Sequence, residues 1–346
     1  MEIEEIVALS VKQNASDLHL CSMQRPRWRR EGKLAEADAL PVLSSVQLEN
    51  FAVNWLNDQQ RQQLELQGQV DLAITLADGI RLRANFFRQR TGLSLALRRI
   101  AGETPTLQQL YAPASLEVLT TCQHGLILVT GATGSGKSTT LAAMIAHLNQ
   151  HSKHILTLED PIEFVHCSQH SLIQQREIGT HCASFAAGLR AALREDPDVI
   201  LLGELRDEET IRLALTAAET GHLVLATLHT RSAASAIERL TDVFSSAEKS
   251  QVRSQLAASL QAVIAQRLQT AAGGGRIALY EVLINTPAIA SMIREGKNHQ
   301  IAAQLQTGGQ WGMQTFEQSL VQRKKAGLVA IQGGLANQSS RIITAD

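Results

Sequence analysis

Aromatic residues and net charge are both scarce in this sequence. Phe, Trp and Tyr make up 3% of its 346 residues, and 32 Lys and Arg residues are balanced by 33 Asp and Glu residues. Motors that track a nucleic acid strand need a basic channel and often use aromatic side chains as stacking platforms. The composition therefore disfavours a nucleic acid partner, and any binding site for an anion must be local.

Cysteines and long apolar runs are scarce as well. Cys21, Cys122, Cys167 and Cys182 are scattered without a C-x-x-C pair, so the spacing predicts neither a zinc site nor a disulfide framework, and it fits a reducing cytoplasm. The N-terminal stretch MEIEEIVAL is acidic where a signal peptide would be basic, and eighteen consecutive apolar residues occur nowhere. We therefore expect a cytoplasmic protein that does not span a membrane.

A chain of 346 residues is longer than one hydrophobic core ordinarily accommodates, so its length favours two domains. Helical spacing covers 2–13 and 45–66, the stretch 70–87 predicts two strands joined at Asp78-Gly79, and 92–100 predicts a further strand. The following stretch, AGETPTLQQLYAPAS, has two prolines and clusters of small residues, which indicate a linker. We predict a small α+β domain at 1–100, a linker at 101–115, a second domain at 116–330 and a loose tail at 331–346.

The second domain has the pattern of an α/β fold with a parallel-rich sheet. Continuous apolar runs recur in GLILVT, HILTL, VILLGE and HLVLATLH, and each is followed by a loop or helix. Such runs are typical of parallel strands that are buried on both faces. We expect helices at 137–151, 184–195, 207–220 and 232–244, then a strand in IALYEVLI and helices at 287–297 and 313–327.

The stretch GATGSGKST, residues 131 to 139, matches the phosphate-binding pattern G-x-x-x-x-G-K-[ST]. It follows an apolar strand and precedes an amphipathic helix, a context that argues against a chance glycine-rich turn. Its glycines let backbone N–H groups turn inward around phosphate oxygens, Lys137 would bridge the β- and γ-phosphates, and Ser138 would offer a hydroxyl to Mg²⁺. The expected ligands of ATP and Mg²⁺ are Gly131, Thr133, Gly134, Ser135, Gly136, Lys137, Ser138 and Thr139.

Two acidic groups end neighbouring core strands. VILLGE carries Gly203 where many ATPases place a magnesium-binding aspartate, and its acid, Glu204, follows one position later. Glutamate has one methylene more than aspartate, and this extra reach partly offsets the later position. Glu204 is therefore expected to contact the water ligands of a magnesium ion. TLEDPIEF supplies Glu159, Asp160 and Glu163. Solvated loops are the alternative, but two such clusters beside a P-loop favour a site.

Histidines and arginines complete the candidates. His222 and His229 lie seven apart, so on one strand they face opposite sides, which argues against a shared metal. His229, at the carboxyl end of its strand, is the better candidate for a γ-phosphate sensor, whereas for His222 a core histidine bonded to backbone is an equal alternative. Arg81 and Arg83 share one strand face and Arg98 ends another strand. A solvated sheet face is their ordinary role.

A family resemblance rests on the P-loop together with TLEDPIEFVH, LRAALREDPDVILLGELRDEETIRLALTAAETGH and LATLHT. These stretches resemble the type II/type IV secretion ATPases, and most closely the type IV pilus retraction ATPases of twitching motility. The resemblance implies a RecA-like P-loop NTPase core behind a PAS-like N-terminal domain. It also implies a homo-hexameric ATPase, cytoplasmic and peripheral at the inner membrane through a pilus platform protein.

The resemblance also implies residue roles. Glu163 would polarise the attacking water, Glu204 would organise the metal, and His222 and His229 would form the family's histidine box beside the nucleotide pocket, with Glu159 on its phosphate side. Arginines matching Arg81, Arg83 and Arg98 would reach a neighbouring subunit's nucleotide, where an arginine supplied in trans contributes ~10³ to 10⁵ in rate.

The sequence departs from the retraction ATPases at two places. AIASMIRE, 288 to 295, has Ser291 and Met292 where the retraction motif A-I-x-N-L-I-R-E has Asn and Leu, and Met23 stands where the family usually has glycine. The missing tetracysteine segment and long N-terminal extension argue against a secretion or pilus-assembly ATPase, which stays the first alternative. A nucleic acid translocase and a non-hydrolysing nucleotide-gated scaffold are alternatives from other classes.

Overall fold

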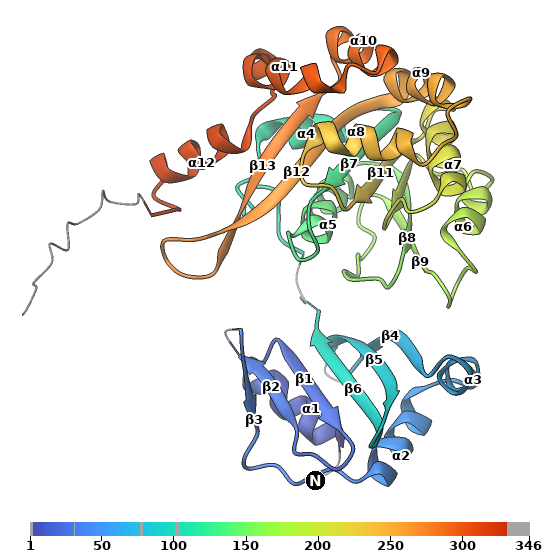
Figure 1. The fold of residues 1–346 in the computed structure, drawn as a ribbon, viewed down its shortest axis with the longest axis vertical. Coiled ribbons are helices and arrows are strands. Elements are labelled where there is room, and N and C mark those ends of the chain that lie inside the picture. The colour runs from blue at the N-terminus through green and yellow to red at the C-terminus, as the bar shows by residue number, and fades with distance from the viewer. Residues whose placement is uncertain (1–2, 31, 77–78, 101–103, 331–346) are drawn as a thin grey trace, which may run out of the picture. The chain divides into compact units, whose positions relative to one another are not determined.

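The computed structural model describes residues 3–30, 32–76, 79–100 and 104–330 (Figure 1). Its contacts divide the chain into two compact units. The first consists of Met1–Thr104, Leu156–Gln169 and Ile173–Gly188, and the second of Pro105–Ile155, His170–Leu172 and Leu189–Asp346. Asp78 of the predicted hairpin turn, part of the predicted linker and the predicted tail lie outside the described residues.

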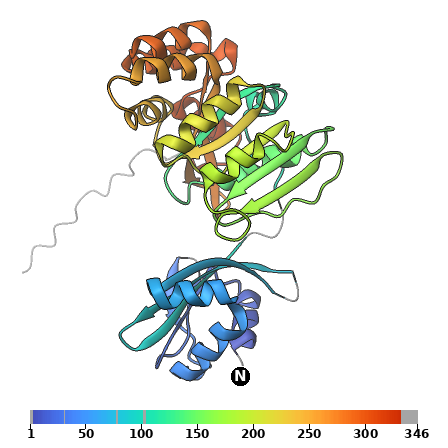
Figure 2. The ribbon, with the colours of Figure 1, turned by 90° about the vertical axis from the view of Figure 1, so that its right-hand side faces the viewer.

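The first unit contains an antiparallel sheet with the strand order β3-β2-β1-β6-β5-β4. Helices α1, α2 and α3 pack beside this sheet (Figure 2). Along β5 the side chains of Leu82, Ala84 and Phe86 are buried and alternate with more exposed residues, because successive side chains of a strand point to opposite faces. The elements are α1 Ile3–Lys12, β1 Asp17–Cys21, β2 Arg27–Arg30, β3 Lys33–Glu36, α2 Ser45–Trp55, α3 Asp58–Gln67, β4 Gln69–Thr75, β5 Arg81–Gln89 and β6 Gly92–Arg99.

The single helix predicted over 45–66 is wrong, because the chain forms two helices there. Leu56 is extended and ends α2. Asn57 then caps α3: its side chain accepts from Gln60 N at 2.9 Å, and the Gln60 side chain accepts from Asn57 N at 3.1 Å. This reciprocal capping box satisfies N–H groups that a continuous helix would bond differently, so it favours a break at this position.

The second sheet has the strand order β13-β12-β7-β11-β10-β8-β9. β12, β7, β11 and β10 run parallel, and β13 pairs antiparallel with β12. All residues of β7 and β11 are buried, as expected for central parallel strands. The predicted α/β class with a parallel-rich sheet is confirmed. The strands are β7 Gly125–Thr130, β8 His154–Glu159, β9 Leu172–Glu177, β10 Val199–Leu202, β11 Leu223–Leu228, β12 Leu260–Thr270 and β13 Arg276–Ile284.

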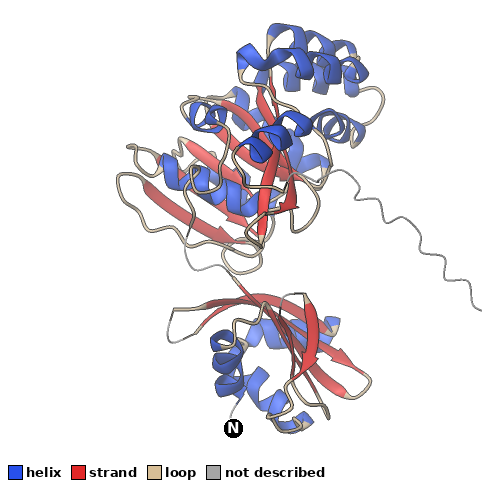
Figure 3. Cartoon of the chain, turned by 90° about the vertical axis from the view of Figure 1, so that its left-hand side faces the viewer, coloured by secondary structure: helices blue, strands red, loops and turns tan. Residues whose placement is uncertain are grey.

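Helices lie beside this sheet (Figure 3). α5 to α8 form at the predicted positions with shorter ends, and Asp207 caps α7 by accepting from Thr210 N at 2.8 Å. α9, α11 and the strands β9 and β12 were not predicted. Among the described residues, no helix combines the length and apolar character needed to cross a membrane. The helices are α4 Ala114–Thr120, α5 Lys137–Leu148, α6 Phe185–Ala192, α7 Glu208–Glu219, α8 Ala233–Asp242, α9 Lys249–Ser259, α10 Pro287–Glu295, α11 Ile301–Thr307 and α12 Phe316–Lys325.

Candidate active site

The P-loop connects β7 to α5, and its glycines are needed for two close approaches. A Cβ on Gly131, at φ 153°, would stand 2.4 Å from the backbone oxygen of Gln266 and 2.5 Å from Ser135 Oγ. A Cβ on Gly136, at φ 91°, would stand 2.7 Å from Gln266 Nε2. At Gly131 the loop can therefore lie against β12 only because this position has no side chain, whereas at Gly136 the left-handed backbone is the stronger reason for glycine.

The polar groups of the loop fit a phosphate. Lys137 is 8% exposed, and its Nζ donates to the carbonyls of Gly131 at 2.9 Å and Ala132 at 3.3 Å. Ser135 Oγ is buried and has no hydrogen-bond partner among the described residues. A buried polar group left unpaired costs about 1–3 kcal/mol, which a phosphate oxygen would remove. The cradle therefore suits the anion that the sequence motif predicts.

The other expected ligands lie around this cradle. Thr133 and Gly134 are exposed at the tip of the loop, and Ser138 and Thr139 are half-buried in the first turn of α5. Within the described ranges, no group of three or more His, Cys, Asp or Glu side chains could hold a metal ion. Because Mg²⁺ prefers octahedral oxygen ligands, an ion near Ser138 would need oxygens from a bound nucleotide and from water.

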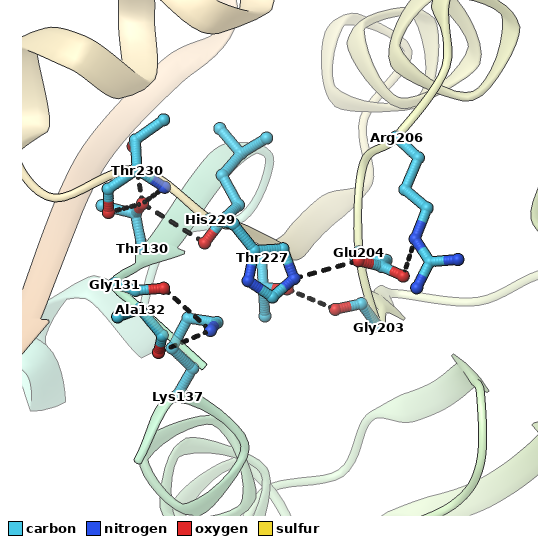
Figure 4. A network of polar contacts seen from close by, with 11 residues as sticks. Thr130, Gly131, Ala132, Lys137, Gly203, Glu204, Arg206, Thr227, His229 and Thr230 are labelled. Atoms are coloured by element: carbon cyan, nitrogen blue, oxygen red, sulfur yellow. Dashed lines mark hydrogen bonds and ion pairs between the residues drawn. The ribbon is translucent and has the colours of Figure 1, made fainter. Parts of the chain in front are cut away.

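Glu204 lies in a network beside the P-loop (Figure 4). It follows β10, is 9% exposed, and its Oε2 lies 3.1 Å from Nε2 of His229, which follows β11. Its Oε1 forms an ion pair with Nε of Arg206. β11 pairs in parallel with both β7 and β10, so the loops that carry Lys137, His229 and Glu204 leave the same edge of the sheet.

Glu159 holds together the loop that carries Glu163. Its Oε1 accepts from Thr157 Oγ1 at 2.7 Å and from Gln175 Nε2 at 3.1 Å, and its carboxylate also accepts from the backbone of Glu163. Gln175 Nε2 donates to Phe164 O at 2.8 Å as well. Burial raises the pKa of Glu159 above its ordinary value, and these hydrogen bonds oppose the rise. Glu159 is thus engaged with its own loop, and Glu163 is half-buried there.

The structure does not bring His222 to the P-loop of its own chain. His222 precedes β11, and its Nδ1 and backbone N both lie 3.1 Å from the carbonyl of Ala217. The neighbouring Leu223 pairs with Gly125, where β7 begins, whereas the P-loop leaves the other end of β7. The two histidines flank β11 seven positions apart, so they are separated by roughly 23 Å at about 3.3 Å per residue.

The arginines of the first unit form part of a row across its sheet. Register pairs Arg83 with Arg98, Arg98 with Asp17, and Asp17 with Arg29, so these side chains share one face. Asp17 Oδ1 lies 2.7 Å from Arg98 Nε, and its Oδ2 lies 3.9 Å from Arg29 Nε. Arg81 lies two residues from Arg83 and therefore projects from the same face of β5.

Asp17 gives this row a measurable pH dependence. Burial would raise the pKa of Asp17, but hydrogen bonds from Ser16 and Arg98 prevail and hold it below the ordinary value. A carboxylate with a lowered folded-state pKa stabilises the native state above its unfolded pKa, and this stabilisation is lost as the pH falls through the folded pKa. Asp17→Asn should therefore melt a few degrees below wild type at pH 7, and the difference should shrink from about pH 5 to about pH 3.

The measurement is thermal unfolding followed by circular dichroism across that pH range. Asp71→Asn is the matched control, since it makes the same change at an exposed position on β4 of the same sheet. If the difference in melting temperature between wild type and Asp17→Asn stayed constant down to about pH 3, the ion pair between Asp17 and Arg98 would be contradicted.

Comparisons with known proteins agree with this geometry. The model of the family described as "Type II/IV secretion system protein" matches residues 2–273. "Uncharacterized protein YggR" of Escherichia coli K12 is 61% identical over 324 residues, 93% of this chain and 98% of that protein. "Type IV pilus retractation ATPase PilT" of Pseudomonas aeruginosa is 47% identical over 342 residues, 99% of this chain and 97% of that protein.

A solved structure, "Crystal Structure of the Pilus Retraction Motor PilT and Bound ADP", superposes with a TM-score of 0.88 at 43% identity, over 96% of this chain and 95% of that one. The chain therefore belongs to the type II/IV secretion system protein family, and within it the chain is a P-loop ATPase. The resemblance to pilus retraction ATPases that the motifs indicate is confirmed.

Sequence reasoning did not find several partners of the site. Arg206 lies two residues after Glu204, but its place in the sequence indicates no role. Thr130, at the end of β7, and Thr230, shortly after β11, carry only the weak signal of a polar residue at the end of an apolar run. The pairing of Asp17 could not be predicted, because its partner Arg98 lies 81 residues away in sequence.

Proposed function

We propose that this chain is the subunit of a hexameric, ATP-hydrolysing motor that powers retraction of a type IV pilus. The observation that carries the proposal is the Glu204–His229 pair at the strand ends beside the Lys137 cradle. A retraction ATPase and a retraction motor with bound ADP are among the similar proteins, and both are matched over nearly the whole chain. The proposed domains are 1–100 and 116–330, joined by a linker at 101–115.

Each side chain has a proposed role. Lys137 and the P-loop N–H groups would bind the β- and γ-phosphates, and Ser138 and Glu204 would hold Mg²⁺, the latter partly through water. A bound ion would supply positive charge beside the phosphate oxygens. Glu163 orients the attacking water, and His229 responds to the γ-phosphate while it steadies Glu204. A carboxylate suits the orientation of water in a loose transition state, which asks for little proton abstraction.

A neighbouring subunit completes the site in this proposal. Arg81, Arg83 and Arg98 project from one sheet face of the first unit, where they would meet the adjacent subunit's nucleotide. His222 stays a proposed nucleotide-binding residue, and its 3.1 Å contact with the Ala217 carbonyl supports the alternative of a core histidine bonded to backbone. The inner-membrane platform protein of the pilus is the proposed partner, with the motor on the cytoplasmic side.

Mixed hexamers test the shared site. Arg98→Ala subunits keep Glu204 but lack the donated arginine, and Glu204→Gln subunits have the reverse defect. Each variant alone should hydrolyse ATP at least about a hundredfold more slowly than wild type, because a trans arginine is worth ~10³ to 10⁵ in rate. Mixing them should restore part of the turnover, because some interfaces then combine an intact Glu204 with an intact Arg98. If mixing the two variants left phosphate release as slow as in each variant alone, the action of Arg98 in trans would be contradicted.

The cellular role has its own test. Deletion of the gene should leave static, surplus pili if the motor drives retraction, whereas absence of pili would indicate an assembly ATPase. Strong stimulation of phosphate release by single-stranded DNA would favour a translocase. Tight ATP binding without phosphate release would favour a scaffold.

A further inference from the structure

The hydroxyl of Thr130 joins the P-loop strand to the loop that carries His229 (Figure 4). Thr130 is the last residue of β7, immediately before Gly131, and it is fully buried. Its Oγ1 accepts from the backbone N–H of Thr230 at 3.0 Å, donates to the Thr230 carbonyl at 2.7 Å, and lies 2.7 Å from Thr230 Oγ1. One hydroxyl thus contacts three polar atoms of a residue that lies 100 positions away.

The hydrogen-bonding capacity of this hydroxyl is fully used. A threonine hydroxyl has one proton and two lone pairs. One lone pair accepts from the Thr230 N–H, and the proton has two acceptors in reach, the Thr230 carbonyl at 2.7 Å and the Leu228 carbonyl at 3.3 Å. The Thr230 hydroxyl lies 2.7 Å away, where it can donate to the remaining lone pair. Several hydrogen bonds to one buried hydroxyl favour a single geometry, since a displacement would lengthen them. The end of β7 and Thr230 are therefore held together as one piece.

Both ends of this contact lead to groups of the ATPase site. Lys137 Nζ donates to Gly131 O, so a bound phosphate that attracts the ammonium would release the carbonyl adjoining Thr130. On the other side, Thr230 is bonded to His229, whose Nε2 lies 3.1 Å from Glu204 Oε2. Lys137 and Glu204 are thus connected through Gly131, Thr130, Thr230 and His229. Each step of this connection is a peptide bond or a hydrogen bond within the second unit.

We propose that Thr130 is a positioning residue that acts through His229. Its hydroxyl sets the place of the His229 ring relative to the P-loop, and the ring in turn holds the Glu204 carboxylate in its orientation for turnover. The proposal rests on the proposed ATP hydrolysis and adds a residue that touches neither nucleotide nor metal. It requires that the hydroxyl matters for turnover much more than for nucleotide affinity.

The test is a double-mutant cycle between Thr130 and His229. Thr130→Val keeps the shape and removes the hydroxyl, and Thr130→Ser keeps the hydroxyl as the matched control. We expect Thr130→Val to lower kcat by about tenfold or more while the Kd for N-methylanthraniloyl-ADP changes less than about threefold, and Thr130→Ser to lie within about threefold of wild type. In a His229→Ala background, Thr130→Val should have little further effect on kcat.

The outcomes separate this proposal from the proposed function. An equal loss of kcat from Thr130→Val with and without His229, or an unchanged kcat in Thr130→Val, would overturn the positioning role. If Thr130→Val does not fold, Thr230→Val takes its place in the double-mutant cycle, since it removes only the contact between the two hydroxyls. We then expect a smaller loss of kcat, and this loss should again disappear in the His229→Ala background. Absence of turnover in wild type would instead contradict the proposed ATPase motor, and the nucleotide affinities would show whether the cradle still binds.

Discussion

Glu204→Gln is expected to stop ATP turnover while nucleotide still binds. In this network Glu204 is the anion between the His229 ring and the Arg206 guanidinium, and it is almost buried. The amide keeps the shape but removes the charge that would organise Mg²⁺ and water, so we expect kcat to fall by about a thousandfold or more. Phosphate release and the Kd for N-methylanthraniloyl-ADP measure the two effects separately.

Glu208→Gln is the matched control for this prediction. Glu208 lies a few residues on, at the start of α7, and carries a solvated ion pair with Arg212 at 2.8 Å. Exposed pairs of this kind contribute little to stability, so its kcat should stay within about twofold of wild type. Turnover by Glu204→Gln close to that of Glu208→Gln would remove Glu204 from the mechanism.

Gly131→Ala is expected to destroy nucleotide binding for a steric reason. The added Cβ would stand 2.4 Å from the carbonyl oxygen of Gln266, which is backbone of β12 and cannot swing aside as a flexible side chain could. The loop must then leave its position against β12, and the Lys137 contact to Gly131 O is lost with it. We expect the affinity for N-methylanthraniloyl-ADP to fall by about a hundredfold or more, because several phosphate contacts depend on this loop.

Gly134→Ala separates steric overlap from backbone strain. Gly134 has φ 76°, yet no atom lies within 4 Å of its added Cβ. The cost is then the left-handed conformation alone, roughly 1–2 kcal/mol. Isothermal titration should show an affinity loss much smaller than that of Gly131→Ala. Equal losses in the two variants would show that strain, and not contact with β12, makes Gly131 necessary.

Local residue patterns predicted the central strands of the second sheet. The other strands depend on pairing with neighbouring strands that are distant in sequence. β7 and β11 were evident because strands that are buried on both faces are apolar throughout. β9 was missed because LIQQRE at the sheet edge has no such run. β12 was missed because it begins directly after α9 and mixes apolar residues with Gln and Arg. In both strands the backbone partners, not the residue pattern, stabilise the extended conformation.

The same division applies to the site. Lys137, Glu204 and His229 could be predicted because each follows a recognisable strand in the sequence. The contacts that position the surrounding loops could not, since Thr130 and Thr230 lie 100 residues apart, and the hydrogen bond between Glu159 and Gln175 needs a strand that the sequence did not reveal. His222 shows the opposite limit, because a motif predicted a place beside the nucleotide, whereas its Nδ1 lies 3.1 Å from the carbonyl of Ala217 at the far end of β11 from the P-loop.

The hydrogen bonds of Glu159 and Gln175 have a consequence for the timing of the reaction. They fix the segment around Phe164 with groups of the protein itself, so nucleotide arrival need not order it. The conformational entropy of that segment is lost when the chain folds and not during each cycle. The backbone that carries the proposed water-orienting residue, Glu163, is accordingly preorganised by the fold itself.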